Sequence, residues 1–396
     1  MSVWADLVGQ GRVIERLSAS ADAAREVVAG SGPGIGMTHA WVFTGPPGSG
    51  RSTAALAFAA ALQCTDLDGL PGCGQCHACH TVLEGTHPDV TVMRPAGLNY
   101  LVDDIRGLVR ASALSPSGGR WQVVVIEDVD RLEGPDQAWR AANALLKAIE
   151  EPSPRTVWIL CAPSLEDVLP TIRSRCRQVG LVTPPAAAVA EVLIRRDGID
   201  PALAAFAARA AQSHVGRARR LARDEASRLR RAEVLQIPTQ LAGVGACLIA
   251  AANLVETASE EAGAATEGRD AAESAELAMA LGQGSSKGLD STGRSQLKDL
   301  EKQQKRRSTR TQRDVLDLAL LDLVSYYRDV LTVQLGAPVD LANIDFEVDI
   351  RRLARQGPPE RTLQHIESIL ACREALAGNV APLLAVEAMT LAMRER

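Results

Sequence analysis

The 396-residue sequence predicts an α/β protein in which a parallel, doubly wound sheet is followed by helical domains. Apolar, β-branched runs alternate with helical patterns between residues 40 and 182, as in strands joined by crossover helices. The run at 121–126 is almost continuously apolar, which favours a strand buried on both faces. Aromatic residues make up only 3% of the chain and alanine is abundant, which favours helices elsewhere. The length is that of about two or three domains.

The expected elements follow in order from the first apolar run, Ala40-Trp41-Val42-Phe43. After it come a Gly-rich loop and an Ala-rich helix at 53–62. Further helices are expected at 102–113 and 135–151, the second ended by Pro152. The remaining strands are expected at 89–93, 121–128, 156–161 and 177–182.

The Gly-rich loop has the spacing of a phosphate-binding G-x-x-x-x-G-K-[ST] motif. Its glycines allow successive backbone N–H groups to point at phosphate oxygens in front of a helix N-terminus. Arg51 stands where the motif has lysine, and a planar guanidinium does not replace a compact ammonium. The alternative is a Gly-Pro turn that caps a helix with Ser52. The residues expected to form a degenerate nucleotide site are Gly45, Gly48, Gly50, Arg51, Ser52 and Thr53.

Two carboxylates, Glu127 and Asp128, end the strand expected at 121–128. The C-terminal end of a parallel strand is where ligands bind in open α/β sheets, near the magnesium of a phosphate loop. Both residues are therefore candidates for the same degenerate site. Asp128 would be one methylene short as a water-orienting base. The alternative is a solvated acidic turn.

Four cysteines, Cys64, Cys73, Cys76 and Cys79, are spaced C-x8-C-x2-C-x2-C within residues 64–80. Thiolates are soft ligands that suit tetrahedral zinc, and a closed four-cysteine shell indicates a structural Zn site. The alternative is a set of reactive or unligated thiols. In a reducing compartment the eight cysteines of the chain are not expected to form disulfides.

The rest of the chain is expected to be helical. Residues 184–235 are rich in alanine and arginine, and helices are also expected at 315–335, 360–376 and 382–393. Between residues 256 and 293 there is no clear apolar period, which predicts a flexible or poorly packed insertion. The basic run at 298–313 is either a solvated helix face or a phosphate contact.

Charge and hydropathy exclude several classes of partner. The net charge of −5 gives no general attraction to nucleic acid, so any DNA contact must be local or made through a partner. The N-terminus has no signal-peptide pattern, and apolar runs such as 241–254 are too short to cross a membrane. We therefore expect a cytoplasmic protein without membrane contact.

These motifs together resemble the clamp-loader branch of the AAA+ ATPases, as found in bacterial DNA polymerase III. The resemblance covers almost the whole chain apart from the insertion, and the cysteine spacing combined with a Ser-Arg-Cys motif is its most specific part. Besides the Gly-rich loop and the cysteines, the matching stretches are Leu7-Val8-Gly9-Gln10, residues 142–152, Ser174-Arg175-Cys176 and residues 379–387.

The resemblance implies three domains: a RecA-like AAA+ domain at 1–182 with a zinc module at 64–80, a helical lid at 183–236, and a helical collar at 237–396. The insertion at about 256–297 would belong to the collar. It also implies that Ser174 and Arg175 supply an arginine finger in trans, with Arg175 reaching the ATP of a neighbouring subunit. The implied partners are gamma/tau and delta subunits in a ring, the sliding clamp, and primed DNA bound through the complex.

Three departures from the family pattern concern the chain's own nucleotide site. They are Arg51, the order Glu127-Asp128, and Ala162-Pro163 where family ATPases carry a polar phosphate sensor. We therefore expect no ATP hydrolysis by this chain and leave the binding of ATP or ADP open. The expected function is that of a stator-like, non-catalytic subunit of a DNA-directed DNA polymerase holoenzyme, which helps to load the clamp.

Two alternatives belong to other functional classes. An active gamma/tau-like ATPase subunit would hydrolyse ATP by itself. A zinc-containing DNA-binding module would use the cysteines and the basic run at 298–313, and would bind DNA in a salt-sensitive way. The scarcity of aromatic residues counts against the second alternative.

Overall fold

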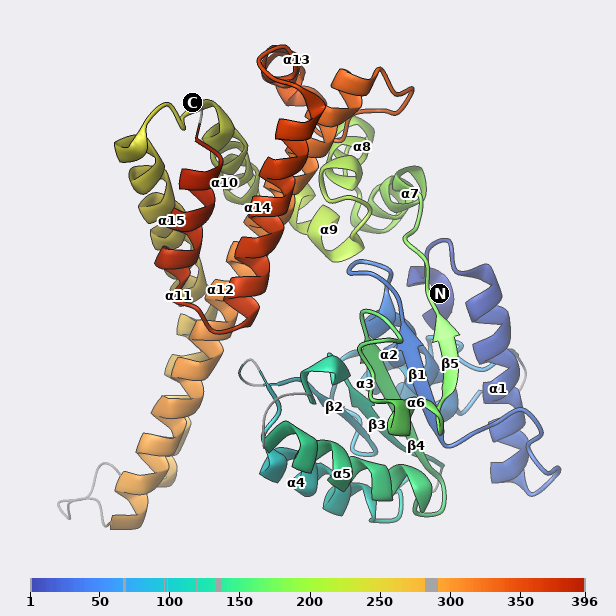
Figure 1. Ribbon diagram of the computed structural model, residues 1–396. Helices are drawn as coiled ribbons and strands as arrows, with labels where there is room; N and C mark the ends of the chain where they lie inside the picture. The colour runs from blue at the N-terminus through green and yellow to red at the C-terminus, as the bar shows by residue number, and fades with distance from the viewer. Residues whose placement is uncertain are drawn as a thin grey trace. The chain divides into compact units, whose positions relative to one another are not determined.

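The computed structural model describes residues 2–66, 69–95, 97, 99–118, 120–132, 137–281 and 291–394, without the side chains of 137–140 and 291–292 (Figure 1). By its contacts the chain divides into two compact units. Unit 1 comprises Met1–Pro95 and Asn99–Arg223, and unit 2 comprises Ala96–Leu98 and Asp224–Arg396.

Unit 1 contains a five-stranded sheet with the order β2-β3-β4-β1-β5, and every neighbouring pair is parallel. Every residue of β3 and β4 is buried, as expected from their continuous apolar runs. The predicted parallel sheet is therefore confirmed. The strands are β1 (Ala40–Thr44), β2 (Val90–Met93), β3 (Gln122–Ile126), β4 (Thr156–Ala162) and β5 (Arg177–Gly180).

Helices cover both faces of this sheet. Alternate strand residues such as Phe43 and Ile159 pack with α1 (Gly11–Ala29) and α2 (Arg51–Gln63) in one core cluster. The other set packs with α4 (Val102–Ser112) and α5 (Gln137–Glu150) in a second cluster. The helix expected at 135–151 is thus observed from Gln137, and residues 133–136 lie outside the described part. The shorter elements of this region are η1 (Val3–Asp6), α3 (His77–Leu83), η2 (Val129–Leu132) and α6 (Pro170–Arg173).

Three further helices of unit 1 share a small core of their own. Leu193 of α7, Ala207 of α8 and Leu221 of α9 belong to this cluster, which is built largely from alanine. The helices expected after residue 184 are therefore present, and the division between the units falls between α9 and the next helix. The bounds are α7 (Ala186–Asp197), α8 (Pro201–Ala210) and α9 (Val215–Arg223).

In the described part of unit 2, all regular secondary structure is helical. Its core includes Leu320, Leu323 and Tyr326 of the longest helix, packed against Ile369 and Val386. Its elements are α10 (Glu225–Gln236), η3 (Ile237–Thr239), α11 (Val244–Ala280), α12 (Ser291–Leu335), η4 (Ile344–Phe346), α13 (Glu347–Ala354), α14 (Pro359–Ala377) and α15 (Pro382–Ala392).

The expectation of a flexible or poorly packed insertion at 256–297 is wrong for the part that the structure describes. Helix α11 continues to Ala280, and Ala258, Ala262 and Thr266 are buried along one of its faces. A stripe of small residues at every fourth position lets α12 approach closely, yet it gives almost no apolar signal in the sequence. Residues 282–290 of the predicted insertion lie outside the described part. In that part of the chain, no helix combines the length and the apolarity that a bilayer crossing requires.

Candidate functional site

The phosphate loop (residues 45–53) connects β1 to α2, as predicted. Its glycines adopt backbone angles that favour glycine, with φ of 157° at Gly45, 87° at Gly48 and 90° at Gly50. A Cβ on Gly48 would lie 2.7 Å from Cα of His214, so this position also requires a residue without a side chain. Ser52 lies inside α2, whose N-cap is Gly50, and the interpretation of the loop as a Ser52 cap is therefore wrong.

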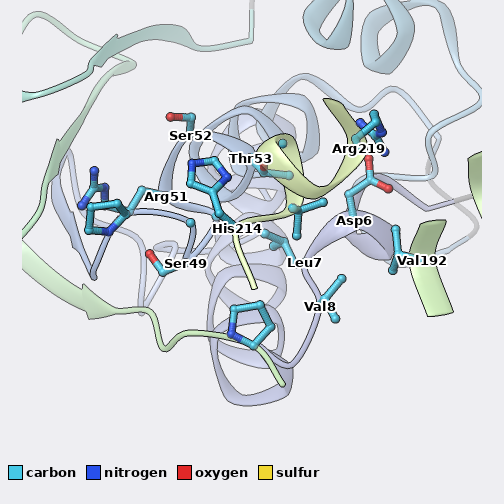
Figure 2. Close-up of a pocket in the computed structure, with 16 residues that line it drawn as sticks. Asp6, Leu7, Val8, Ser49, Arg51, Ser52, Thr53, Val192, His214 and Arg219 are labelled. Atoms are coloured by element: carbon cyan, nitrogen blue, oxygen red, sulfur yellow. The ribbon is translucent and has the colours of Figure 1, made fainter. Parts of the chain in front are cut away.

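The loop forms one wall of a cavity of about 310 Å³ (Figure 2). The other walls come from the N-terminal residues 6–8 and from the helices α7 and α9 with the turn before α9. All of these segments belong to unit 1. The lining residues are Asp6, Leu7, Val8, Pro47, Gly48, Ser49, Gly50, Arg51, Ser52, Thr53, Pro184, Val192, His214, Val215, Gly216 and Arg219.

The structure thus brings most of the predicted loop residues to one cavity but not the predicted carboxylates. Gly45, Glu127 and Asp128 are absent from its lining. Glu127 instead pairs with Arg94 at 2.9 Å, and Asp128 faces Arg131 at 3.8 Å. The acidic end of β3 is therefore occupied by two arginines.

Arg51 turns back onto its own loop, where it donates a hydrogen bond to the carbonyl of Gly45. It lies close enough to Cys161 on β4 to influence that thiol. Burial raises the pKa of Cys161, the negative charge of Glu127 adds to the effect, and the positive charge of Arg51 opposes it. The ends of β1, β3 and β4 therefore converge near this arginine.

His214 is a pocket residue to which the sequence analysis gave no role. Figure 2 shows its ring beside the loop, between Arg51 and Thr53. The backbone N–H of Arg217 donates to its Nδ1 at 3.3 Å, which leaves the hydrogen of the neutral ring on Nε2. Burial lowers the pKa of His214, and the charges of Arg217 and Arg51 lower it further. The only local signal was a histidine in the turn before a basic helix.

Gln10 holds the loop to the end of the sheet. Its side-chain amide donates to the carbonyl of Ser49 at 3.2 Å and to that of Val182 at 2.6 Å. Its Oε1 accepts a hydrogen bond from the N–H of Val182 at 3.3 Å. In the sequence this residue was visible only as part of the Leu7–Gln10 motif, without this role.

Arg175 lies on the surface of unit 1, just after the short helix α6, and neither it nor Ser174 lines the cavity. Its guanidinium pairs with Glu150 at 2.6 Å and donates to the carbonyl of Thr171 at 2.9 Å and to Oγ of Ser174 at 3.1 Å. The Arg175 side chain remains 41% exposed. These three contacts fix the orientation of the guanidinium, and part of the side chain still faces solvent.

The four predicted metal ligands meet in one place. The Sγ atoms of Cys64, Cys73, Cys76 and Cys79 all lie within 4.8 Å of one another. Backbone N–H groups point at two of these sulfurs: Cys76 donates to Cys73 at 3.3 Å, and Cys79 donates to Cys76 at 3.4 Å. In the structure, none of the eight cysteines is joined to another by a disulfide. This donor set could hold a metal such as zinc.

Comparison with known proteins gives a family match and several similar proteins. A family described as DNA polymerase III, delta subunit, matches residues 35–185. The DNA polymerase III subunit delta' of Pseudomonas aeruginosa is 39% identical over 41% of this chain and 49% of its own length. The Bacillus subtilis delta' subunit is 28% identical over 51% of this chain and 59% of its own.

A gamma/tau subunit is also similar to this chain. The DNA polymerase III subunit gamma/tau of Mycobacterium bovis is 31% identical over 43% of this chain and 27% of its own length. The chain spans about half the length of the first delta' relative. The resemblance to DNA polymerase III clamp-loader subunits is confirmed, and the chain is similar to the delta' subunit in particular.

Proposed function

We propose that this protein is a clamp-loader subunit of bacterial DNA polymerase III and acts in DNA replication as delta' subunits do. The similarity to several delta' subunits supports this assignment. Its proposed partners are gamma/tau and delta subunits in a ring, the sliding clamp, and primed DNA held through the complex. On this proposal it works in the cytoplasm as a non-catalytic part of the holoenzyme.

The observation that carries the finer proposal is the placement of Arg175. A guanidinium that lies outside its own chain's cavity and faces solvent is available to the ATP site of a neighbouring subunit. Its forked donors match the oxygens that gain charge during phosphoryl transfer. Arg175 is therefore the proposed trans arginine finger, and Ser174 supports it by accepting one of its hydrogen bonds.

The chain's own phosphate loop is proposed not to hydrolyse ATP. Arg51 is engaged with the Gly45 carbonyl, and Glu127 is paired with Arg94. A hydrolytic site needs a free cation for the outer phosphates and a carboxylate free to orient magnesium or water. Should ATP or ADP bind here, the amides of Gly48 and Gly50 and the hydroxyl of Ser52 would hold its phosphates. We assign no nucleotide to this site.

The cysteine cluster is proposed to hold a structural zinc ion. Zinc would tie the loop that contains Cys64 and Cys73 to α3, which carries Cys79. A closed four-thiolate shell leaves no position for substrate, so this site has no role in the chemistry.

The decisive experiment is a clamp loader reconstituted with Arg175→Ala. We expect the variant complex to assemble and to lose most of its DNA-stimulated ATP hydrolysis and clamp loading. An assembled variant complex with wild-type loading would refute the trans finger. The alternative of an active ATPase subunit predicts hydrolysis by the purified chain alone, abolished by Arg51→Ala, and a hydrolysis assay on the purified chain tests it.

A further inference from the structure

Helices α11 and α12 form a long hairpin within unit 2 that extends beyond α14 and α15 (Figure 1). The two arms differ in charge. The charged residues of the arm at 256–276 are glutamate and aspartate except for Arg269, whereas the returning arm at 294–313 is rich in lysine and arginine. Opposite charges on the facing sides would form ion pairs between the two arms. The side chains on the outer face would then determine what the hairpin can bind.

The facing sides are indeed paired. Arg307 on α12 contacts Asp270 at 2.6 Å and Glu273 at 3.0 Å on α11. Gln304, one turn earlier, donates to the carbonyl of Asp270 at 3.0 Å. These contacts identify the side of α12 that faces α11, and the opposite side is the outer face of the hairpin, where Arg306 lies near Gly97.

Three lysines lie on that opposite side. Lys298, Lys302 and Lys305 are all exposed, and their spacing of four and three residues places them in one stripe along α12. Within the part of the chain that the structure describes, their ammonium groups have no acidic partner within ion-pair distance. The stripe extends along about 10 Å of helix.

We propose that this lysine stripe, Lys298-Lys302-Lys305, binds the sugar-phosphate backbone of duplex DNA. The inference rests on the proposed clamp-loader function, which brings primed DNA to the complex. About 10 Å corresponds to roughly three phosphates along one strand, at an axial spacing of 3.4 Å. The arm at 293–313 contains no aromatic residue on which bases could stack, so duplex backbone fits it better than single-stranded DNA.

The test uses the full chain and a fluorescent primer-template duplex, with binding followed by anisotropy at several salt concentrations. The variant Lys298→Gln/Lys302→Gln/Lys305→Gln removes the stripe. A matched control, Arg351→Gln/Arg352→Gln/Arg355→Gln, removes the same number of positive charges from exposed residues at α13 of the same unit. Circular dichroism of both variants checks that the helices remain folded.

We expect the stripe variant to bind at least about tenfold more weakly at 50 mM salt, with a slope of log K against log salt reduced by up to about 2.7. The control should bind as the wild-type chain does. Equal losses in the two variants would mean a general effect of net charge, and no loss in the stripe variant would mean that DNA lies elsewhere. Either result overturns the proposal. It is also overturned if DNA binding by the wild-type chain does not weaken as the salt concentration rises.

A separate measurement distinguishes this inference from the proposed function. Assembly of the wild-type chain with gamma/tau and delta subunits tests the clamp-loader assignment, whatever the stripe does. If the stripe variant assembles, binds DNA normally and yet loads clamps poorly, the stripe contacts an acidic protein surface and the DNA proposal is wrong.

Discussion

The substitution Glu150→Gln tests how Arg175 is held. The pair is short, at 2.6 Å, but its side chains are 41% and 46% exposed. Exposed ion pairs of this kind contribute about 0.2–1 kcal/mol. Because about 1.36 kcal/mol corresponds to a factor of ten, loss of the charge should change the population of the held rotamer by about 1.5- to 5-fold. The hydrogen bonds from Arg175 to Thr171 and Ser174 remain.

The assay is steady-state ATP hydrolysis by the reconstituted complex on primed DNA. We expect Glu150→Gln to lower kcat by about 1.5- to 5-fold, with a smaller effect at high salt because exposed pairs are screened. Arg175→Ala should cost far more, up to about 10³-fold, since it removes the guanidinium itself. The neighbouring Glu151→Gln is the matched control and should be neutral.

Two results would contradict this reasoning. A loss in Glu150→Gln as large as that of Arg175→Ala would mean that Glu150 has a role of its own in the reaction. Equal losses in Glu150→Gln and Glu151→Gln would mean that the acidic end of α5, rather than the ion pair, matters.

Three further predictions concern stability and metal content. Cys64→Ser and Cys79→Ser should each abolish bound zinc in the purified chain, measured by elemental analysis, and lower its melting temperature; metal content at the wild-type level would refute the four-cysteine site. Arg231→Met should leave Asp322 buried without its 3.0 Å partner and cost about 3–5 kcal/mol in urea unfolding, whereas the exposed Arg355→Met should cost little. Burial lowers the pKa of His365 from 6.5 to about 4, so the unfolded chain takes up a proton there at a higher pH than the folded chain does. The neutral histidine therefore costs no stability above pH 6.5, and the folded state loses stability as the pH falls from 6.5 towards 4. His365→Gln should reduce this loss in melting experiments, and an unchanged dependence of the melting temperature on pH would contradict the lowered pKa.

The parts of the fold that the sequence predicted correctly have strong local signals. The strand at 122–126 is apolar from Val123 onward and the cysteines are close in sequence, so neither prediction required knowledge of distant contacts. The same holds for the phosphate loop, whose glycine spacing is visible in nine residues. Local patterns therefore sufficed for the sheet, the loop and the candidate metal ligands.

The parts that were missed depend on contacts between distant residues or on weak patterns. His214 lies at the loop only because the turn before α9 packs onto Gly48, and nothing in its neighbourhood indicates this. The helical arm after residue 256 was missed because alanine at every fourth position carries little apolar signal. The actual pairing of Glu127 with Arg94 depends on how β2 and β3 align, which residue spacing alone does not determine.

The contact between Gln10 and Val182 has a consequence for how the protein is made. It joins residues that are 172 positions apart in the sequence. A growing chain emerges from the ribosome N-terminus first, so this contact cannot form before Val182 has been synthesised, and the cavity is not complete before Arg219. Until Val182 is synthesised, the phosphate loop lacks the link that Gln10 makes between Ser49 and Val182. Premature termination before residue 177 would leave β1 without its partner β5 and the loop without its contact to Val182, a state open to misfolding and proteolysis.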